Sequence, residues 1–158
     1  MLEFKNRKAS FDFFFVQEIE AGIVLKGTEI KSIRLGKINF KDSYARIDDG
    51  EVWLYNLHIS PYEKTTYFNH EPTRKRKLLL HKREIRRLKN KVEQDGMTLV
   101  PKSVYINENS KCKVLLALAK GKKNYDKRES IQEKDIKRDN ERKEKYDWEI
   151  RTSITKFL

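Results

Sequence analysis

The strongest chemical feature of the sequence is a dense run of positive charge in the middle of the chain. Residues 74–91 contain ten Lys or Arg and a single acid, Glu84, a net charge of +9 in 18 positions. A solvated helix face normally carries both signs, whereas a one-signed surface attracts phosphates, because each contact releases condensed counterions. The candidate nucleic-acid contacts are Arg74, Lys75, Arg76, Lys77, Arg83, Arg86 and Arg87.

A second basic run places an aromatic ring among cations. Residues 120–128 hold four Lys, one Arg and Tyr125. A tyrosine ring can stack on an unpaired base, which is the usual way to read RNA, because the deep groove of an A-form helix hides its base edges. Tyr62, Tyr67 and Phe68 could serve the same purpose or pack their own loop.

Groups that could build a catalytic or metal site are sparse. His58, His70 and His81 lack paired metal-ligand spacing, and the single cysteine, Cys112, excludes a Cys-rich zinc site. The chain has no P-loop, dinucleotide glycine signature or nucleophile elbow. We therefore expect no enzymatic activity, no cofactor and no metal, and we expect Cys112 to be a small buried side chain.

The overall charge also indicates a polyanionic partner. The net charge is +12, from 36 basic and 24 acidic residues. A membrane is a poor candidate, because no apolar run approaches the roughly 20 residues that span a bilayer, and residues 1–10 lack the apolar stretch of a signal peptide. A lone cysteine agrees with a reducing compartment. The sequence thus predicts a cytoplasmic protein with no membrane partner.

Hydrophobic patterns predict the elements that must position these charges. Strands are expected over residues 11–19, 39–47, 52–59, 98–106 and 111–119, with turns near 21–22, at Asp49-Gly50 and around 108–110. One helix is expected over residues 29–35, with Thr28 as its cap. Another is expected over about residues 79–94, with Ile85, Leu88 and Val92 as its apolar stripe and Gly96 at its end.

These elements predict a mainly β fold. A closed OB-like barrel of about six strands, with two or three short helices, hides the edges that an open sheet would expose. Beyond residue 120 aliphatic residues become rare up to residue 145. We therefore expect an OB-like RNA-binding domain over 1–120 and a basic C-terminal tail over 121–158, disordered when free and helical on a partner, with a merely solvated tail as the alternative.

Several short runs, in order along the chain, resemble the SsrA-binding protein (SmpB) family. Each run alone is weak, but together they are highly specific and cover residues 6–130. The runs are Asn6-Arg7-Lys8-Ala9, Glu20-Ala21-Gly22-Ile23, Gly27-Thr28-Glu29-Ile30-Lys31-Ser32-Ile33-Arg34, Asp42-Ser43-Tyr44, Pro72-Thr73-Arg74-Lys75-Arg76-Lys77-Leu78-Leu79-Leu80, Gly121-Lys122-Lys123 and Asp126-Lys127-Arg128.

The resemblance implies a role without catalysis in bacterial ribosome rescue, or trans-translation. The barrel is expected to bind the tRNA-like domain of transfer-messenger RNA (tmRNA) and to deliver it to ribosomes stalled without a codon. The tail is expected to occupy the small-subunit decoding centre and the empty mRNA channel. We expect a monomer that acts with the elongation factor that carries aminoacyl-tRNA.

The resemblance also implies roles for single residues. Glu20, Leu79 and His81 would belong to the RNA-binding surface, with His81 where family members often have Asn. In the tail, Arg142, Lys143 and Glu144 replace an apolar pair of some members, and residues 146–158 receive no role. The expected ribosome contacts are Lys122, Lys123, Tyr125, Asp126, Lys127, Arg128, Lys134, Lys137 and Arg138.

Two other functions stay open at this point. A general OB-type ribosomal or translation-associated protein would use the same basic surfaces without preferring one RNA, because phosphate contacts carry no sequence information. An RNA-processing enzyme would need a carboxylate or histidine site. Preference for a tRNA-like fold over unrelated RNA at equal salt separates the first of these from the rescue factor.

Overall fold

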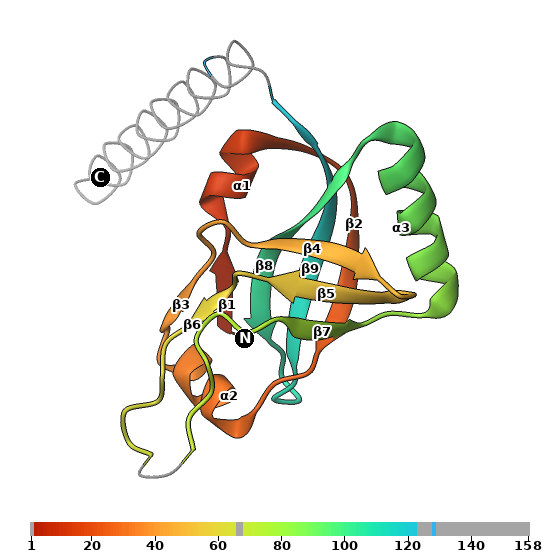
Figure 1. Ribbon diagram of the computed structural model, residues 1–158. Helices are drawn as coiled ribbons and strands as arrows, with labels where there is room; N and C mark the ends of the chain where they lie inside the picture. Colours follow the sequence, from red (N-terminus) through yellow and green to blue (C-terminus); the bar gives the residue numbers. More distant parts are fainter. Residues whose placement is uncertain (1, 66–67, 123–127, 129–158) are drawn as a thin grey trace, which may run out of the picture. The chain divides into compact units, whose positions relative to one another are not determined.

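Six strands close into a ring (Figure 1). The computed structural model describes residues 2–65, 68–122 and 128, and the chain divides into two units, 1–121 and 122–158. The described elements all lie in the first unit. They are β1 (Leu2–Lys5), α1 (Arg7–Asp12), β2 (Phe13–Ile23), α2 (Gly27–Arg34), β3 (Ile38–Asn39), β4 (Tyr44–Asp48), β5 (Glu51–Tyr55), β6 (His58–Ile59), β7 (Arg76–Leu79), α3 (Lys82–Asp95), β8 (Thr98–Ile106) and β9 (Cys112–Gly121).

The ring runs in the order β8-β4-β5-β7-β2-β9 and closes through β9 and β8. β1 adds to the outer edge at β8, and β3 pairs with β6 in a separate two-stranded sheet. The prediction of a mainly β, closed OB-like fold with about six strands and up to three helices is confirmed. Within the described residues, no helix is long and apolar enough to cross a membrane.

The interior of the ring is packed with aliphatic side chains. Along β5, Val52 and Leu54 are fully buried while Trp53 and Tyr55 are half-exposed, which is the alternation expected of a strand with one face in the core. α3 adds Ile85 and Leu88 to the same core. Each fully buried Leu, Ile or Val contributes about 1.5–3 kcal/mol.

The Asp49-Gly50 turn was predicted correctly. Asp48 pairs with Glu51, so only two residues join β4 to β5. Their φ angles are 52° and 73°, the left-handed conformation that tight hairpin turns require and that Gly adopts without a steric penalty. This turn fixes the register that places Tyr44 opposite Tyr55.

The strand predicted over residues 11–19 was wrong at both ends. Residues 11 and 12 belong to α1, which Asn6 caps: its Oδ1 accepts from the Ala9 N–H at 3.2 Å, and its Nδ2 donates to the Pro101 carbonyl at 2.8 Å. At the other end β2 continues to Ile23, because β9 stays paired with it as far as Gly22. The turn predicted near 21–22 is therefore absent.

The predicted helix starts were also wrong. Lys26, not Thr28, precedes α2, and the Thr28 hydroxyl lies 2.8 Å from His70 Nδ1. Since His70 Nε2 must donate to the Ile59 carbonyl, at 2.8 Å, a neutral ring accepts from Thr28. Leu79 is not helical, because β7 pairs with β2 there, and α3 begins only at Lys82.

A buried ion pair ties α2 to β7. Glu29 and Arg76 have no exposed surface, and Arg76 Nε donates to one carboxylate oxygen of Glu29. The other oxygen accepts from Arg74 and from the Lys26 N–H, the latter at 2.8 Å. Burial alone would raise the pKa of Glu29, but the hydrogen bonds from Arg74, Lys26 and Arg76 outweigh it and lower that pKa below 4.5.

The Glu29→Gln substitution is expected to lower the free energy of unfolding by about 3–5 kcal/mol, because it leaves buried guanidinium charge without its counterion. Urea unfolding followed by tryptophan fluorescence measures this. Glu51→Gln is the matched control: it breaks the half-exposed Glu51–Lys77 pair, whose ions are 2.9 Å apart, and should cost less than about 1 kcal/mol. Equal losses for both variants would contradict this account.

At acidic pH the free energies of unfolding of the wild type and of Glu29→Gln should become more similar. Because folding lowers the pKa of Glu29, its stabilising contribution is complete above about pH 4.5 and is lost as the pH falls through the folded value. Urea unfolding of both proteins between about pH 6 and pH 3 measures this. A stability difference that stays constant over that interval would show that folding does not change the pKa of Glu29.

Candidate RNA-binding surface

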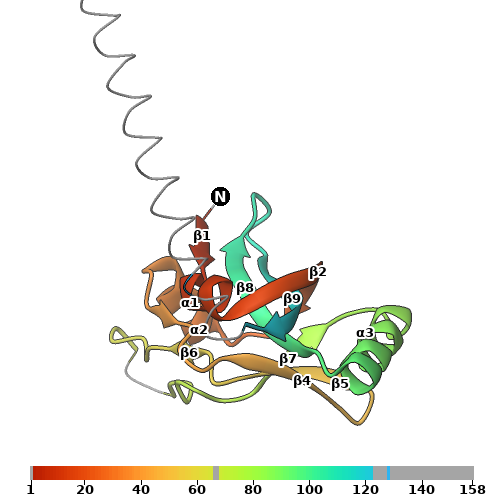
Figure 2. The same ribbon diagram turned by 90° about the horizontal axis from the view of Figure 1, so that it is seen from above.

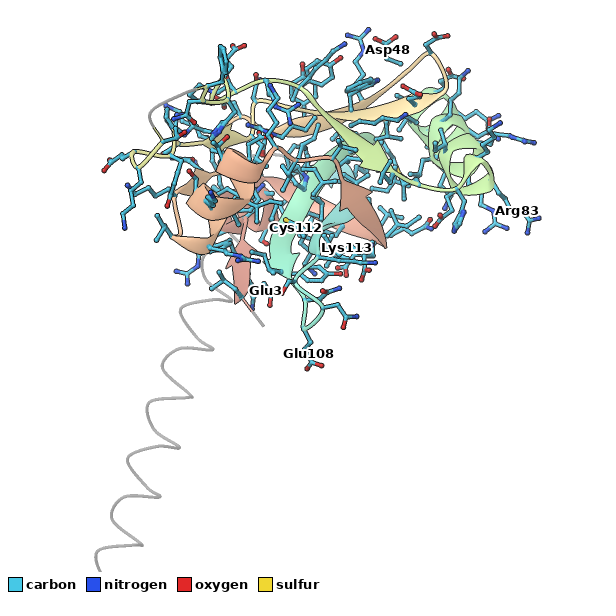
Figure 3. The ribbon with its side chains drawn as sticks, turned by 90° about the horizontal axis from the view of Figure 1, so that it is seen from below. Glu3, Asp48, Arg83, Glu108, Cys112 and Lys113 are labelled. Atoms are coloured by element: carbon cyan, nitrogen blue, oxygen red, sulfur yellow. The ribbon has the colours of Figure 1, made fainter. Side chains whose placement is uncertain are left out.

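α3 presents a row of cations to solvent. Its apolar stripe faces the ring through Ile85 and Leu88, so the charged positions between them point outward. Arg83, labelled in Figure 3, extends from the outer side of the helix. Within the described part of the chain, these cations have no ion-pair partner within 4.0 Å. We call this row the cationic ridge: Lys82, Arg83, Arg86 and Arg87, all exposed.

The ends of α3 hold the ridge in place. His81 is the N-cap residue, and its backbone N–H donates to Glu84 Oε1 at 3.0 Å. Gly96 ends the helix in the left-handed conformation, with a φ of 63°. A short helix that is capped at both ends and packed on the core keeps its exposed arginines at fixed spacing.

The cations before α3 are not all available to RNA. Arg76 was expected to contact RNA, but its side chain is fully buried: besides Glu29, it donates to the Leu57 carbonyl at 2.6 Å and the Pro72 carbonyl at 3.0 Å. Arg74 is 23% exposed and also holds Glu29. The expected role of Arg76 is therefore corrected from RNA contact to core ion pair.

Lys75 and Lys77 remain at the surface of the ring, where each has a neighbour. The Lys75 ammonium lies 4.6 Å from the centre of the Trp53 ring, and Lys77 Nζ donates to Glu51 at 2.9 Å. Both contacts involve partly exposed groups, so they cost little to exchange for a phosphate. These two lysines extend positive charge from the ridge onto the outer face of β5 and β7.

Glu20 and Leu79 lie on one face of the paired strands β2 and β7, and His81 is the residue before the ridge. Leu79 is 53% exposed and pairs with Gly22, two residues along β2 from Glu20 and on the same face. A side chain at Gly22 would begin 3.3 Å from the Leu79 Cβ, so glycine makes room for this leucine. His81 follows at the start of α3. An apolar group, an acid and a ring thus adjoin the cations.

Tyr105 was missed from the sequence. Its hydroxyl donates to Glu20, across β9, and burial together with the Glu20 hydrogen bond raises the pKa of Tyr105 to about 12. The tyrosine therefore stays protonated and orients the carboxylate. The sequence signal that could have identified Tyr105 is its position between Val104 and Ile106. Both are buried in β8, and strand alternation therefore directs Tyr105 to the outer face.

Most of the predicted ribosome contacts cannot be placed. Lys122 is half-exposed and Arg128 is exposed. The helical-tail prediction also falls on residues that the structure does not describe. Outside the described residues lie Lys123, Tyr125, Asp126, Lys127, Lys134, Lys137 and Arg138.

Among the described residues, no three His, Cys, Asp or Glu side chains lie close enough to hold a metal ion. His70 is buried, and its ring is hydrogen-bonded to the Ile59 carbonyl. Burial raises the pKa of Cys112 to about 11, which keeps its thiol protonated.

Comparison with known proteins gives one consistent family. An SsrA-binding protein of Caldicellulosiruptor bescii is 62% identical over 130 residues (82% of both chains), and one of Carboxydothermus hydrogenoformans is 57% identical over 138 residues (87% of this chain, 92% of the relative). A chain in the solved structure described as "tmRNA-SmpB: a journey to the center of the bacterial ribosome" is 53% identical, with a TM-score of 0.67 over 83% of this chain and 95% of that one. The family model "SmpB protein" matches residues 3–146. The chain belongs to the SmpB protein family.

Proposed function

We propose that this protein binds the tRNA-like domain of tmRNA and delivers it to ribosomes stalled without a codon. The cationic ridge contacts the phosphates, and Glu20, Leu79 and His81 contact the RNA beside it. The tail, residues 121–158, occupies the decoding centre and the empty mRNA channel. The protein acts in the cytoplasm, as a monomer and without catalysis, together with the elongation factor that carries aminoacyl-tRNA.

The observation that carries this proposal is the unpaired, one-signed charge of the cationic ridge next to a surface that is not basic. Phosphate contacts by the ridge supply affinity but do not distinguish one RNA from another. Leu79 and Glu20 supply contacts of another kind, which a phosphate would not favour. The match to SsrA-binding proteins over most of the chain supports tmRNA as the RNA that this combined surface fits.

A competition assay tests the choice of RNA. Labelled tRNA-like RNA is bound to the protein at near-physiological salt and displaced by unlabelled self, elongator tRNA or unstructured RNA of equal length. The unlabelled tRNA-like RNA should displace the labelled RNA at a lower concentration than either of the other two competitors. Equal displacement by all three would reduce the protein to a general OB-type RNA binder, whose affinity comes from phosphates alone.

The triple substitution Arg83→Ala, Arg86→Ala and Arg87→Ala is expected to weaken binding of tRNA-like RNA and to flatten its dependence on salt. Each lost phosphate contact lowers the slope of log K against log salt by about one, so the slope should fall by up to about three. Fluorescence anisotropy titrations of the RNA at salt concentrations from about 50 to about 300 mM measure this slope.

The control for the ridge removes the same charge elsewhere. Arg34, Lys41 and Lys111 are exposed and lie outside α3. Their combined replacement by alanine changes the net charge by the same three units and should leave the slope nearly unchanged. If the slope of log K against log salt fell equally for both triple variants, the RNA would be bound by the overall positive charge of the protein and not by the ridge.

Truncation after Gly121 separates the two units. Binding of tRNA-like RNA should stay within about threefold of the full chain, because the ring, the ridge and Glu20 are intact. Rescue of ribosomes stalled on an mRNA without a stop codon, followed as transfer of the nascent chain in a purified translation system, should be lost. Loss of both activities would contradict this division of labour.

A further inference from the structure

A groove lies beside the ridge, where β4 meets α3. β4 pairs with β8 at one register position only, Ala45 opposite Leu99, so the ring has a weak seam there. α3 lies along this seam, near the ends of β4 and β5 (Figures 1 and 2). Side chains of β4, α3 and β8 line a groove with a volume of about 330 Å³.

The groove is lined by an aromatic ring, apolar side chains and cations. Tyr44 lines it and is 38% exposed. Its ring stacks on that of Tyr55, with centroids 5.3 Å apart and planes inclined by 12°, so one ring face is covered and the ring is held rigid. Ile47, Val92 and Met97 contribute apolar surface, and the exposed Arg46 and Lys89 bring positive charge, against one acid, Glu93.

Positive and aromatic groups continue from the groove across the sheet. Arg46 pairs in register with Trp53, and Trp53 pairs with Lys77 on the next strand, while Lys75 lies over the Trp53 ring. This row crosses β4, β5 and β7. Alternating rings and cations are the arrangement by which proteins bind single-stranded nucleic acid, with bases on the rings and phosphates at the cations.

We propose that this groove binds one unpaired nucleotide of RNA, with its base on Tyr44 and its flanking phosphates at Arg46 and Lys89. The proposal rests on the proposed function, in that the protein acts on RNA, and adds a second contact site. A volume near the lower limit for ligand pockets suits one nucleotide. A base within a duplex is already stacked and cannot enter, and an apolar peptide side chain would gain nothing from the cations.

The test uses the full chain and a short unstructured RNA that carries a single 2-aminopurine, whose fluorescence reports stacking. Tyr44→Leu should weaken binding of this RNA roughly tenfold, since it removes the stacking ring but keeps apolar bulk. Tyr44→Phe keeps the ring and should remain within about twofold of wild type. A blunt-ended RNA duplex with the same number of phosphates should bind both variants and the wild type equally.

A second measurement does not depend on any variant folding. The same RNA with 5-iodouridine in place of the 2-aminopurine is crosslinked to the wild-type protein by light, and the modified peptide is identified. Crosslinks at Tyr44 are expected. Crosslinks confined to other residues, or an equal loss of binding to the duplex and to the unstructured RNA on Tyr44→Leu, would overturn the proposal and leave the groove to another class of partner.

The two proposals fail in different ways. If tRNA-like RNA wins the competition assay but Tyr44→Leu binds the unstructured RNA as well as wild type does, the groove proposal is wrong and the proposed function stands. If all RNAs compete equally while the Tyr44 dependence and the crosslink persist, the protein is a general RNA binder that uses the groove.

Discussion

The interaction on which the rest of the body depends is the buried carboxylate of Glu29. It joins elements that are distant in the sequence: Arg76 begins β7, and Arg74 precedes it and also donates to the Val24 carbonyl, just after β2, at 3.3 Å. Arg76 in turn holds the carbonyls of Leu57 and Pro72. A buried charge pair is not in itself a large source of stability, because desolvation offsets the attraction, but it tolerates few alternative geometries. The pair thus fixes where β7 enters the ring.

The Glu29–Arg76 pair determines which residues of the basic run 74–91 face the core and which face solvent. With Arg76 turned into the core at the start of β7, strand alternation sends Lys77 and Leu79 outward. Only two residues then separate β7 from α3. The exposed leucine, the N-cap histidine and the ridge therefore follow one another at fixed positions. One stretch of basic sequence serves two purposes: its first arginines neutralise Glu29, and its later ones face solvent.

Local signals explain what the sequence could predict. The Asp49-Gly50 hairpin, the strand over residues 98–106 and the outward face of α3 follow from turn chemistry and periodicity within a few residues. The misses depend on partners far along the chain. Arg76 is buried by an acid 47 positions away, the cap of α1 is held by a carbonyl 95 positions away, and β7 differs from a helix start only through its pairing with β2 and β5.

The acid Glu20 has a consequence for the RNA binding that we propose for the cationic ridge. Glu20 repels phosphates. Its place near Leu79 therefore lowers the affinity for any RNA that presents only its phosphate backbone there. It becomes favourable when the RNA offers a donor, such as a base amine or a 2′-hydroxyl, and Tyr105 holds the carboxylate ready by donating to one of its oxygens. In the function proposed for this protein, the cationic ridge brings RNA to the surface, whereas the acid penalises RNAs that lack the matching donor. Selectivity for one folded RNA requires both, because a uniformly basic face would bind every polyanion of similar length.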